Sequence, residues 1–202
     1  LGPKFQDHYA IYDLGKVPGI DARLGGALIK PADPNNLLII GNPGLPSAQL
    51  FKIGLTRGLC GHITGFQGSA TVVADVPQAQ SILLAREDLL LITVTPSNRL
   101  YQLLNDANTP SWTYDFDVMK EVQYSASGIG IVPDSYGLPA RTLCFSSWTL
   151  GAFTCGSIKT DGPLAELSGL TQLSTYSDAD FGFAYVPESL DLPAKGWRSH
   201  AA

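Results

Sequence analysis

Residues 25–40 read Gly25-Gly-Ala-Leu-Ile-Lys-Pro-Ala-Asp-Pro-Asn-Asn-Leu-Leu-Ile-Ile40. The stretch consists of an apolar run, a turn rich in Pro, Asp and Asn, and a second apolar run. Short apolar runs bounded by such turn residues are typical of β-strands. The stretch therefore predicts two strands joined by a turn, and Gln49–Leu55 predicts a third strand directly after them.

The same order of elements recurs along the chain. A second copy begins at Ser81, a third at Gly128 and a fourth at Gly182. Aligning Pro31, Arg86, Pro133 and Pro187 gives steps of 55, 47 and 54 residues, close to the ~40–50 residues of a propeller blade. The first three units each close with one more strand, predicted at 70–74, 112–116 and 170–174.

These repeats predict an all-β fold of repeated antiparallel sheets, arranged as in a β-propeller. A propeller-like domain is expected over residues 1–189, followed by a tail over 190–202. Its predicted units span 25–76, 80–124, 128–176 and 182–189, and a lone strand at 9–14 is expected to join the last unit. Two arrangements follow from this count: a four-bladed ring with a short last blade, or an incomplete, open arc whose edges need a partner.

Composition supports the strand-rich interpretation and excludes some partners. The 202 residues include 21 Gly and 14 Pro, which favours short elements and tight turns over long helices. The formal net charge is −5 and the basic residues form no cluster, so nucleic acid is not an expected partner. Apolar runs are of strand length, so we expect no transmembrane segment and membrane association only through partner proteins.

Five fragments carry a resemblance to a known family. They are Asp13-Leu-Gly-Lys-Val-Pro-Gly19, Gly61-His-Ile-Thr-Gly-Phe-Gln-Gly-Ser-Ala-Thr71, Pro96-Ser-Asn-Arg-Leu100, Ser146-Ser-Trp148 and Gly182-Phe-Ala-Tyr-Val-Pro187. In this order they resemble exported bacterial propeller-like proteins that often bear a PEP-CTERM sorting tail. The resemblance implies an exported protein, periplasmic or extracellular, and it supplies no catalytic residues. The tail itself has no counterpart in these 202 residues.

Cys144 and Cys155 are the candidate disulfide. The segment 142–156 predicts a hairpin that turns at Thr149 and Leu150, and this register places opposite each other residues whose numbers sum to 299. The two cysteines then face each other across the strands, near bonding distance. Two separately packed thiols are the alternative, and Cys60 is left over as a buried or free thiol.

Metal-binding patterns are weak. Asp178 and Asp180 could offer oxygen ligands to calcium, as could the turn at Asp33–Asn36. Short acidic turns are far more often Asx-turns, however, and no EF-hand loop is present. We therefore expect no cofactor, with calcium at Asp178 and Asp180 as the weak alternative.

Residues 112–117 alternate between aromatic and acidic side chains. Trp112, Tyr114 and Phe116 would share one face and are expected to pack between neighbouring sheets. Asp115 and Asp117 would lie on the opposite face, towards solvent.

No zinc-protease or serine-hydrolase motif occurs, which argues against an enzyme without excluding one. We expect a non-catalytic exported β module that serves as a protein-binding, accessory or structural subunit of a larger assembly. A metal-dependent propeller hydrolase of the lactonase or esterase type is one alternative, because its ligands would leave no contiguous motif. A carbohydrate-binding module is the other.

Overall fold

The fold is all-β, as the sequence predicts. The computed structural model describes residues 11–21, 23–59, 61–105, 107–119, 126–133, 139, 141–147, 151–175 and 183. Twelve strands and one helical turn, α1 (Phe116–Met119), lie within these residues. No helix in this part of the chain is long and apolar enough to cross a membrane.

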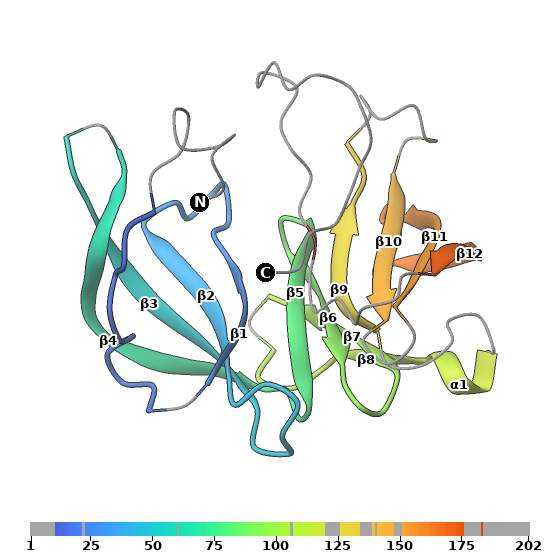
Figure 1. The fold of residues 1–202 in the computed structure, drawn as a ribbon, viewed down its shortest axis with the longest axis horizontal. Coiled ribbons are helices and arrows are strands. Elements are labelled where there is room, and N and C mark those ends of the chain that lie inside the picture. The colour runs from blue at the N-terminus through green and yellow to red at the C-terminus, as the bar shows by residue number, and fades with distance from the viewer. Residues whose placement is uncertain are drawn as a thin grey trace.

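The strands form three antiparallel sheets of four strands each (Figure 1). The first sheet contains β1 (Leu24–Leu28), β2 (Asn36–Gly41), β3 (Gln49–Arg57) and β4 (Ile63–Asp75). The second contains β5 (Ala79–Arg86), β6 (Leu89–Val94), β7 (Arg99–Leu104) and β8 (Trp112–Asp115). The third contains β9 (Ala126–Ile131), β10 (Thr142–Ser147), β11 (Ala152–Lys159) and β12 (Glu166–Thr175). In each sheet the strands are ordered as in the chain.

The sheets span residues 24–75, 79–115 and 126–175, against predicted units of 25–76, 80–124 and 128–176. The predicted strand at 9–14 is wrong where it can be compared, because residues 11–14 form no strand. Ile11 and Tyr12 are mostly exposed, and the Asp13 carboxylate accepts a hydrogen bond from Gly15 N, which makes a local turn instead. The predicted unit at 182–189, apart from Phe183, and the tail at 190–202 lie outside the described residues.

The first seam, between the first and second sheets, buries aliphatic side chains from both. Leu38, Ile40 and Leu50 of the first sheet meet Ile82 and Leu90 of the second. Glycine at position 26 allows the sheets to approach, since a Cβ there would lie 2.7 Å from both Ile82 N and Ser81 Cα. The Gly-Gly pair that opens the first unit thus lets β1 pack against β5.

The second seam, between the second and third sheets, is larger and contains aromatic rings. Leu89 and Leu91 of β6 face Leu143 and Phe145 of β10, and Phe116 packs edge-on to Phe145 with ring centroids 5.4 Å apart. Strand β6 is buried on both faces because Leu90 and Ile92 point into the first seam. A strand covered on both faces explains the continuous apolar run from Leu89 to Val94.

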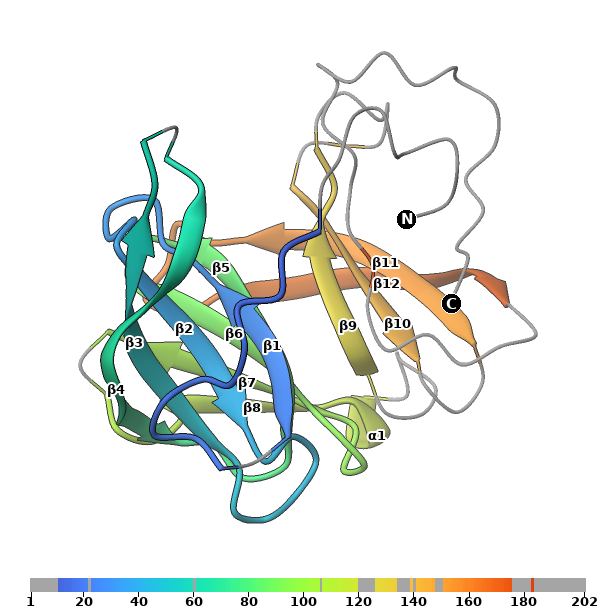
Figure 2. The ribbon, with the colours of Figure 1, turned by 60° about the vertical axis from the view of Figure 1, so that its left-hand side comes forward.

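The outer faces of the first and third sheets are covered differently. The segment that precedes β1 lies over the first sheet (Figure 2). Val17 and Ile20 pack on Phe51 and Ile53 of the first sheet, and the Ala70 N–H donates to Pro18 O. We call residues 17–20 the N-terminal strap. On the third sheet, Phe183 packs edge-on to Phe153 at 5.1 Å between ring centroids.

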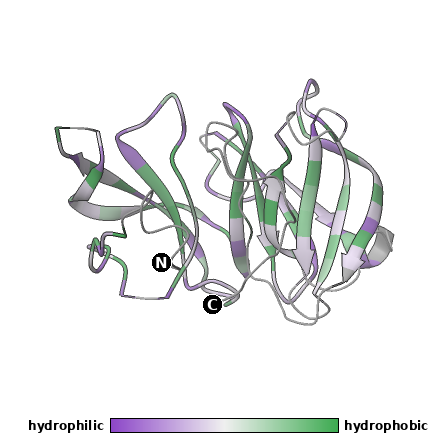
Figure 3. Ribbon diagram, turned by 45° about the horizontal axis from the view of Figure 1, so that its top comes forward, coloured by the Kyte–Doolittle hydropathy of each residue, from purple (hydrophilic) through white to green (hydrophobic). Residues whose placement is uncertain are grey.

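The arrangement is an open one. Hydrophobic residues recur along the strands of all three sheets (Figure 3), and stacking neighbouring sheets face to face buries them. Within the described residues the three sheets do not close into a ring, so the expectation of a closed four-bladed ring is not met there.

Candidate functional site

A cleft of about 440 Å³ opens at the first seam. Its lining combines leucines deep in the seam with polar and charged residues at the rim. The leucines are Leu38, Leu50, Leu90, Leu103 and Leu104, and the polar or charged residues are Lys30, Asp33, Asn36, Lys52, Glu87 and Asn105. Ligand-binding sites typically combine an apolar floor with a few polar groups, so the cleft is the first candidate for a binding site.

The polar groups at the rim bind one another. Lys30 Nζ donates to Asn105 Oδ1 at 2.5 Å and to Glu87 O at 3.2 Å, which joins the first sheet to the second. Lys52 Nζ lies 2.8 Å from Asp33 Oδ2, and Asn36 Nδ2 donates to Asp33 Oδ1 at 2.7 Å. The hydrogen bond from Lys52, and then that from Asn36, hold the pKa of Asp33 below its ordinary value. Lys30 thus joins the two sheets at the rim, whereas the bonds to Asp33 lie within the first sheet.

The turn at Asp33–Asn36 was the other weak calcium candidate from the sequence, and its polar groups also bind one another and Lys52. Asp33 Oδ1 and Oδ2 accept from Asn36 and Lys52, and Asn36 N donates to Asp33 O at 3.2 Å. The turn is therefore closed by a backbone hydrogen bond from residue i+3 to residue i, as in a β-turn, and both carboxylate oxygens of Asp33 accept bonds from side chains.

Arg86 fastens the second seam. Its Nε and Nη2 bind the carboxylate of Asp88. Its Nη1 and Nη2 donate to three carbonyl oxygens in the connection between β11 and β12, those of Thr160, Gly162 and Pro163. These contacts use all five N–H groups of the guanidinium. The hydrogen bonds from Arg86 also lower the pKa of Asp88. Every donor is engaged within the protein, so Arg86 acts here as a structural clamp.

Gln102 forms a second polar link in the same seam and is fully buried. Its Nε2 donates to Ala165 O at 2.8 Å, and its Oε1 accepts from Ala165 N at 2.7 Å. The side chain thereby satisfies both backbone groups of a buried residue that directly precedes β12 of the third sheet. Sequence reasoning missed this residue, although a lone glutamine among the apolar residues of Leu100–Leu104 was an available signal.

Buried threonines add to these links. Thr93 Oγ1 donates to Ser127 O at 2.6 Å, and Thr95 Oγ1 donates to Ala126 O at 3.1 Å. Both acceptors belong to β9, the strand that opens the third sheet. Gly128-Ile-Gly130 lies on the same strand, where Ser146 Oγ accepts from Gly128 N at 3.0 Å.

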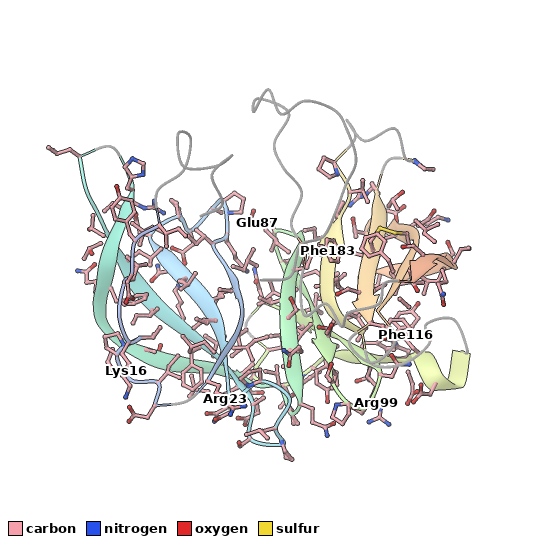
Figure 4. All side chains as sticks on the ribbon, in the orientation of Figure 1. Lys16, Arg23, Glu87, Arg99, Phe116 and Phe183 are labelled. Atoms are coloured by element: carbon pink, nitrogen blue, oxygen red, sulfur yellow. A yellow bond between two sulfur atoms is a disulfide. The ribbon has the colours of Figure 1, made fainter. Side chains whose placement is uncertain are left out.

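Cys144 and Cys155 are direct partners in the pairing of β10 with β11, and their Sγ atoms form a disulfide at 2.01 Å (Figure 4). The hairpin has the predicted register. Each pair, from Thr142 with Ser157 to Ser146 with Phe153, has residue numbers that sum to 299. The predicted turn at Thr149 and Leu150, like Cys60, lies outside the described residues. Both cysteines are buried with Val132 on the outer face of the third sheet.

The predicted metal candidates Asp178 and Asp180 also lie outside the described residues. In the part of the chain that the structure describes, no group of three or more His, Cys, Asp or Glu could hold a metal ion. Asp115 pairs with Arg99 at 3.0 Å, and Asp117 Oδ1 accepts from Asn98 Nδ2 at 2.7 Å. These carboxylates fasten neighbouring strands and turns.

The aromatic residues of 112–116 only partly follow the expectation. Phe116 is fully buried and Tyr114 packs beside it, 6.5 Å between ring centroids, in the second seam. Trp112 is 53% exposed, so the expectation that it packs between sheets is wrong. The strand is also shorter than predicted, because β8 ends at Asp115 and Phe116 opens α1.

Each sheet has two edge strands. On one side β1 contacts β5 and β5 contacts β9, which leaves β4, β8 and β12 as the outer edges of the described sheets. Each carries apolar side chains that are about half exposed, namely Val72, Trp112 and Leu173. The inward polar groups described above are occupied by structural bonds, so these edges are the surfaces most suited to contact with another molecule. A comparison of the chain with protein-family models and with curated proteins finds no match in either.

Proposed function

We propose that this chain is a non-catalytic, exported β module that serves as a protein-binding or structural subunit of a larger assembly. The observation that carries the proposal is the contrast between its seams and its edges. The polar side chains described at the two seams, Lys30, Arg86 and Gln102, are engaged in holding sheet to sheet, whereas apolar side chains are exposed on the outer strands. Such edges favour association with other proteins.

We further propose a propeller-like arc as the architecture. The strands that open each sheet support it, because β1 contacts β5 and β5 contacts β9, while β4, β8 and β12 lie at the opposite edges. Phe183 adds a second support. Ile82, Ile129 and Phe183 each stand four residues before the aligned positions Arg86, Pro133 and Pro187, and each packs on the preceding sheet.

Export is supported by the disulfide. Disulfides persist in oxidising compartments and are rare in the cytosol. The Cys144–Cys155 bond lies in a buried cluster of the third sheet, where it joins adjacent strands. Intact mass measured with and without reduction, on chain produced in a bacterial periplasm, should show the loss of two hydrogens that one disulfide requires.

Light scattering coupled to size-exclusion chromatography, with proteins that co-purify identified by mass spectrometry, tests the assembly role. The proposal expects complexes larger than one chain. A compact, folded monomer with no affinity for co-purifying proteins would count against it.

Elemental analysis and a panel of lactone and ester substrates test the enzyme alternative on the same preparation. A stoichiometric, tightly held divalent metal together with hydrolysis would replace the proposal by the propeller hydrolase. The exposed Trp112 motivates a glycan array as the matching test of a carbohydrate-binding module.

A further inference from the structure

The rim of the cleft at the first seam contains a lysine whose charge has no direct counter-ion. Lys30 is half-buried, and its Nζ donates to Asn105 Oδ1 and to the backbone oxygen of Glu87, both of which are uncharged. Among the described residues, no carboxylate lies within ion-pair distance of this ammonium group. An ammonium group has three N–H donors, so the two bonds to the second sheet leave one donor and the positive charge at the rim.

The acidic groups close to Lys30 already have cations of their own. The pKa values of Asp33 and Asp88 are lowered chiefly by hydrogen bonds from Lys52 and Arg86, respectively, and to a lesser degree by Lys30 acting through space. Both carboxylates are therefore compensated without a direct bond to Lys30. The rim can thus accept one further anionic group.

The remaining carboxylate in the cleft lining belongs to Glu87, which is labelled in Figure 4. Its side chain is exposed, so water weakens the repulsion between this carboxylate and an anion bound elsewhere in the cleft. Glu87 contributes to the lysine's surroundings through its backbone oxygen instead, which accepts from Lys30 Nζ at 3.2 Å.

The donors at this point of the rim suit a carboxylate. Asn105 Nδ2 makes one long hydrogen bond, to Glu87 O at 3.5 Å, and within the described part of the chain its second N–H has no acceptor. Lys30 and Asn105 thus have one N–H each to offer, from two groups that are already bonded to each other. Two neighbouring donors match the two oxygens of a carboxylate, whereas a phosphate has more acceptor oxygens and a second charge to satisfy.

The same cleft has aliphatic groups at its surface. Val73 of β4 is 37% exposed, and Leu104 and Ala107 are half-buried. Leu50 and Leu103 form the buried wall behind them. The volume of about 440 Å³ lies within the range of small-molecule sites, roughly 300–1,000 Å³. A short aliphatic chain would therefore find apolar contacts in the cleft that contains the lysine.

We propose that the cleft binds a small aliphatic carboxylate, whose charged group contacts Lys30 and Asn105 and whose chain covers Val73, Leu104 and Ala107. The proposal adds a ligand to the protein and does not depend on the assembly role. Because the lining residues come from both sheets, a bound carboxylate would bridge the first seam and stabilise the folded chain.

Saturation-transfer NMR titrations of the full chain with three probes test the ligand class. Hexanoate should bind saturably. Hexanamide, which has the same chain length without the charge, should bind about tenfold more weakly or less well still, because a charge-assisted hydrogen bond is lost. Acetate, which lacks the chain, should give no saturable binding.

Two lysine variants test the charged contact. Lys30→Met keeps most of the aliphatic stem and removes the ammonium group, so it should weaken hexanoate binding by about tenfold. Lys16→Met is the matched control, because the Lys16 side chain is 83% exposed and pairs with Asp21 outside the cleft, and its affinity should equal that of the parent chain. Urea unfolding shows whether Lys30→Met is folded, and the comparison of hexanoate with hexanamide on the parent chain does not require this variant.

Two valine variants test the apolar contact. Val73→Ser should weaken hexanoate binding by about twofold to fivefold, because it removes apolar surface from the cleft. Val72→Ser changes the neighbouring residue, which is 53% exposed and is not part of the cleft lining, so it should bind hexanoate as the parent chain does.

Three outcomes overturn the inference. They are the absence of saturable hexanoate binding, equal binding of hexanoate and hexanamide, and equal affinity of the parent chain and a folded Lys30→Met for hexanoate. None of them bears on complexes with other proteins, so the proposed assembly role is judged separately by light scattering.

Discussion

The two seams join equivalent sheets by different means. The first seam brings β1 close to β5 through glycine, buries aliphatic side chains and leaves an open cleft whose rim is held by Lys30. The second seam contains aromatic rings packed edge-on and is closed by a buried polar link from Gln102 and a part-buried one from Arg86. Repeated sheets therefore need not pack through the same kind of interface. The repeat pattern fixes where strands and turns fall, but it does not fix which side chains fill each seam.

This difference predicts that the second seam contributes more to stability and tolerates less change. Cavities in a closed apolar cluster stay empty, whereas a cavity beside an open cleft can fill with water or relax. Substitutions in the two seams can therefore confirm or break the contrast.

The largest effect is expected at Phe145. Phe145→Ala should lower the free energy of unfolding by about 3–5 kcal/mol, because it removes a fully buried ring and leaves a cavity beside Phe116. Leu103→Ala, in the cleft wall of the first seam, should cost about 2 kcal/mol, the low end for such a change. Urea unfolding measures both, and equal losses would remove the distinction between the seams.

Gln102→Leu comes next. The substitution keeps the size of the side chain but leaves the N–H and C=O of Ala165 without their partner, at a cost of about 1–3 kcal/mol. Gln67→Leu, at an exposed position of β4, should change stability by less than about 0.5 kcal/mol. Thermal and urea unfolding of both variants provide the comparison; a neutral Gln102→Leu would show that the link is dispensable.

Gly26→Ala tests the close approach in the first seam. Its new Cβ would meet the backbone of β5 at 2.7 Å, so the sheets must separate, at about 1–3 kcal/mol. Gly162→Ala is the control, because the nearest atom to a Cβ there is Leu164 O at 3.5 Å. If both variants unfold at the same urea concentration, glycine is not what allows the sheets to approach.

The smallest effect concerns acid and the rim of the cleft. The folded-state pKa of Asp33 lies below its ordinary value of 3.8, so its ion pair with Lys52 stabilises the fold above that value. This contribution is lost as the pH falls through the lowered folded-state pKa. Asp33→Asn lacks the titrating group, so the difference in thermal midpoint between it and the parent chain should shrink on acidification below about pH 4. A difference that is constant with pH would contradict the ion pair.

Local pattern was enough to predict most strands, and in one place their register. The run Leu89–Val94 and the turn residues around Pro31 mark strands on their own, and the spacing of Cys144 and Cys155 predicts which residues of β10 and β11 are paired. These features depend on neighbours in the chain, which the order of residues reveals directly.

Features that depend on contacts between sheets could not be predicted in this way. Alternation places Trp112 and Phe116 on one face, but only the position of the third sheet decides which of them is covered. Arg86 aligned with the turn prolines of the repeat. The sequence around Arg86 does not indicate that its N–H groups would donate to the carbonyl oxygens of residues 160–163. Likewise, residues 11–14 have the composition of a strand but no neighbouring strand to pair with.

The order of pairing within each sheet has a consequence for biosynthesis. Among the described strands, each pairs only with strands adjacent to it in the chain, from β1–β2 through to β11–β12. Each hairpin can therefore form as soon as its second strand has left the ribosome, without waiting for distant sequence. Because each later sheet packs on one that is already complete, the nascent chain can assemble from its first sheet onward and bury each new apolar face as it is made.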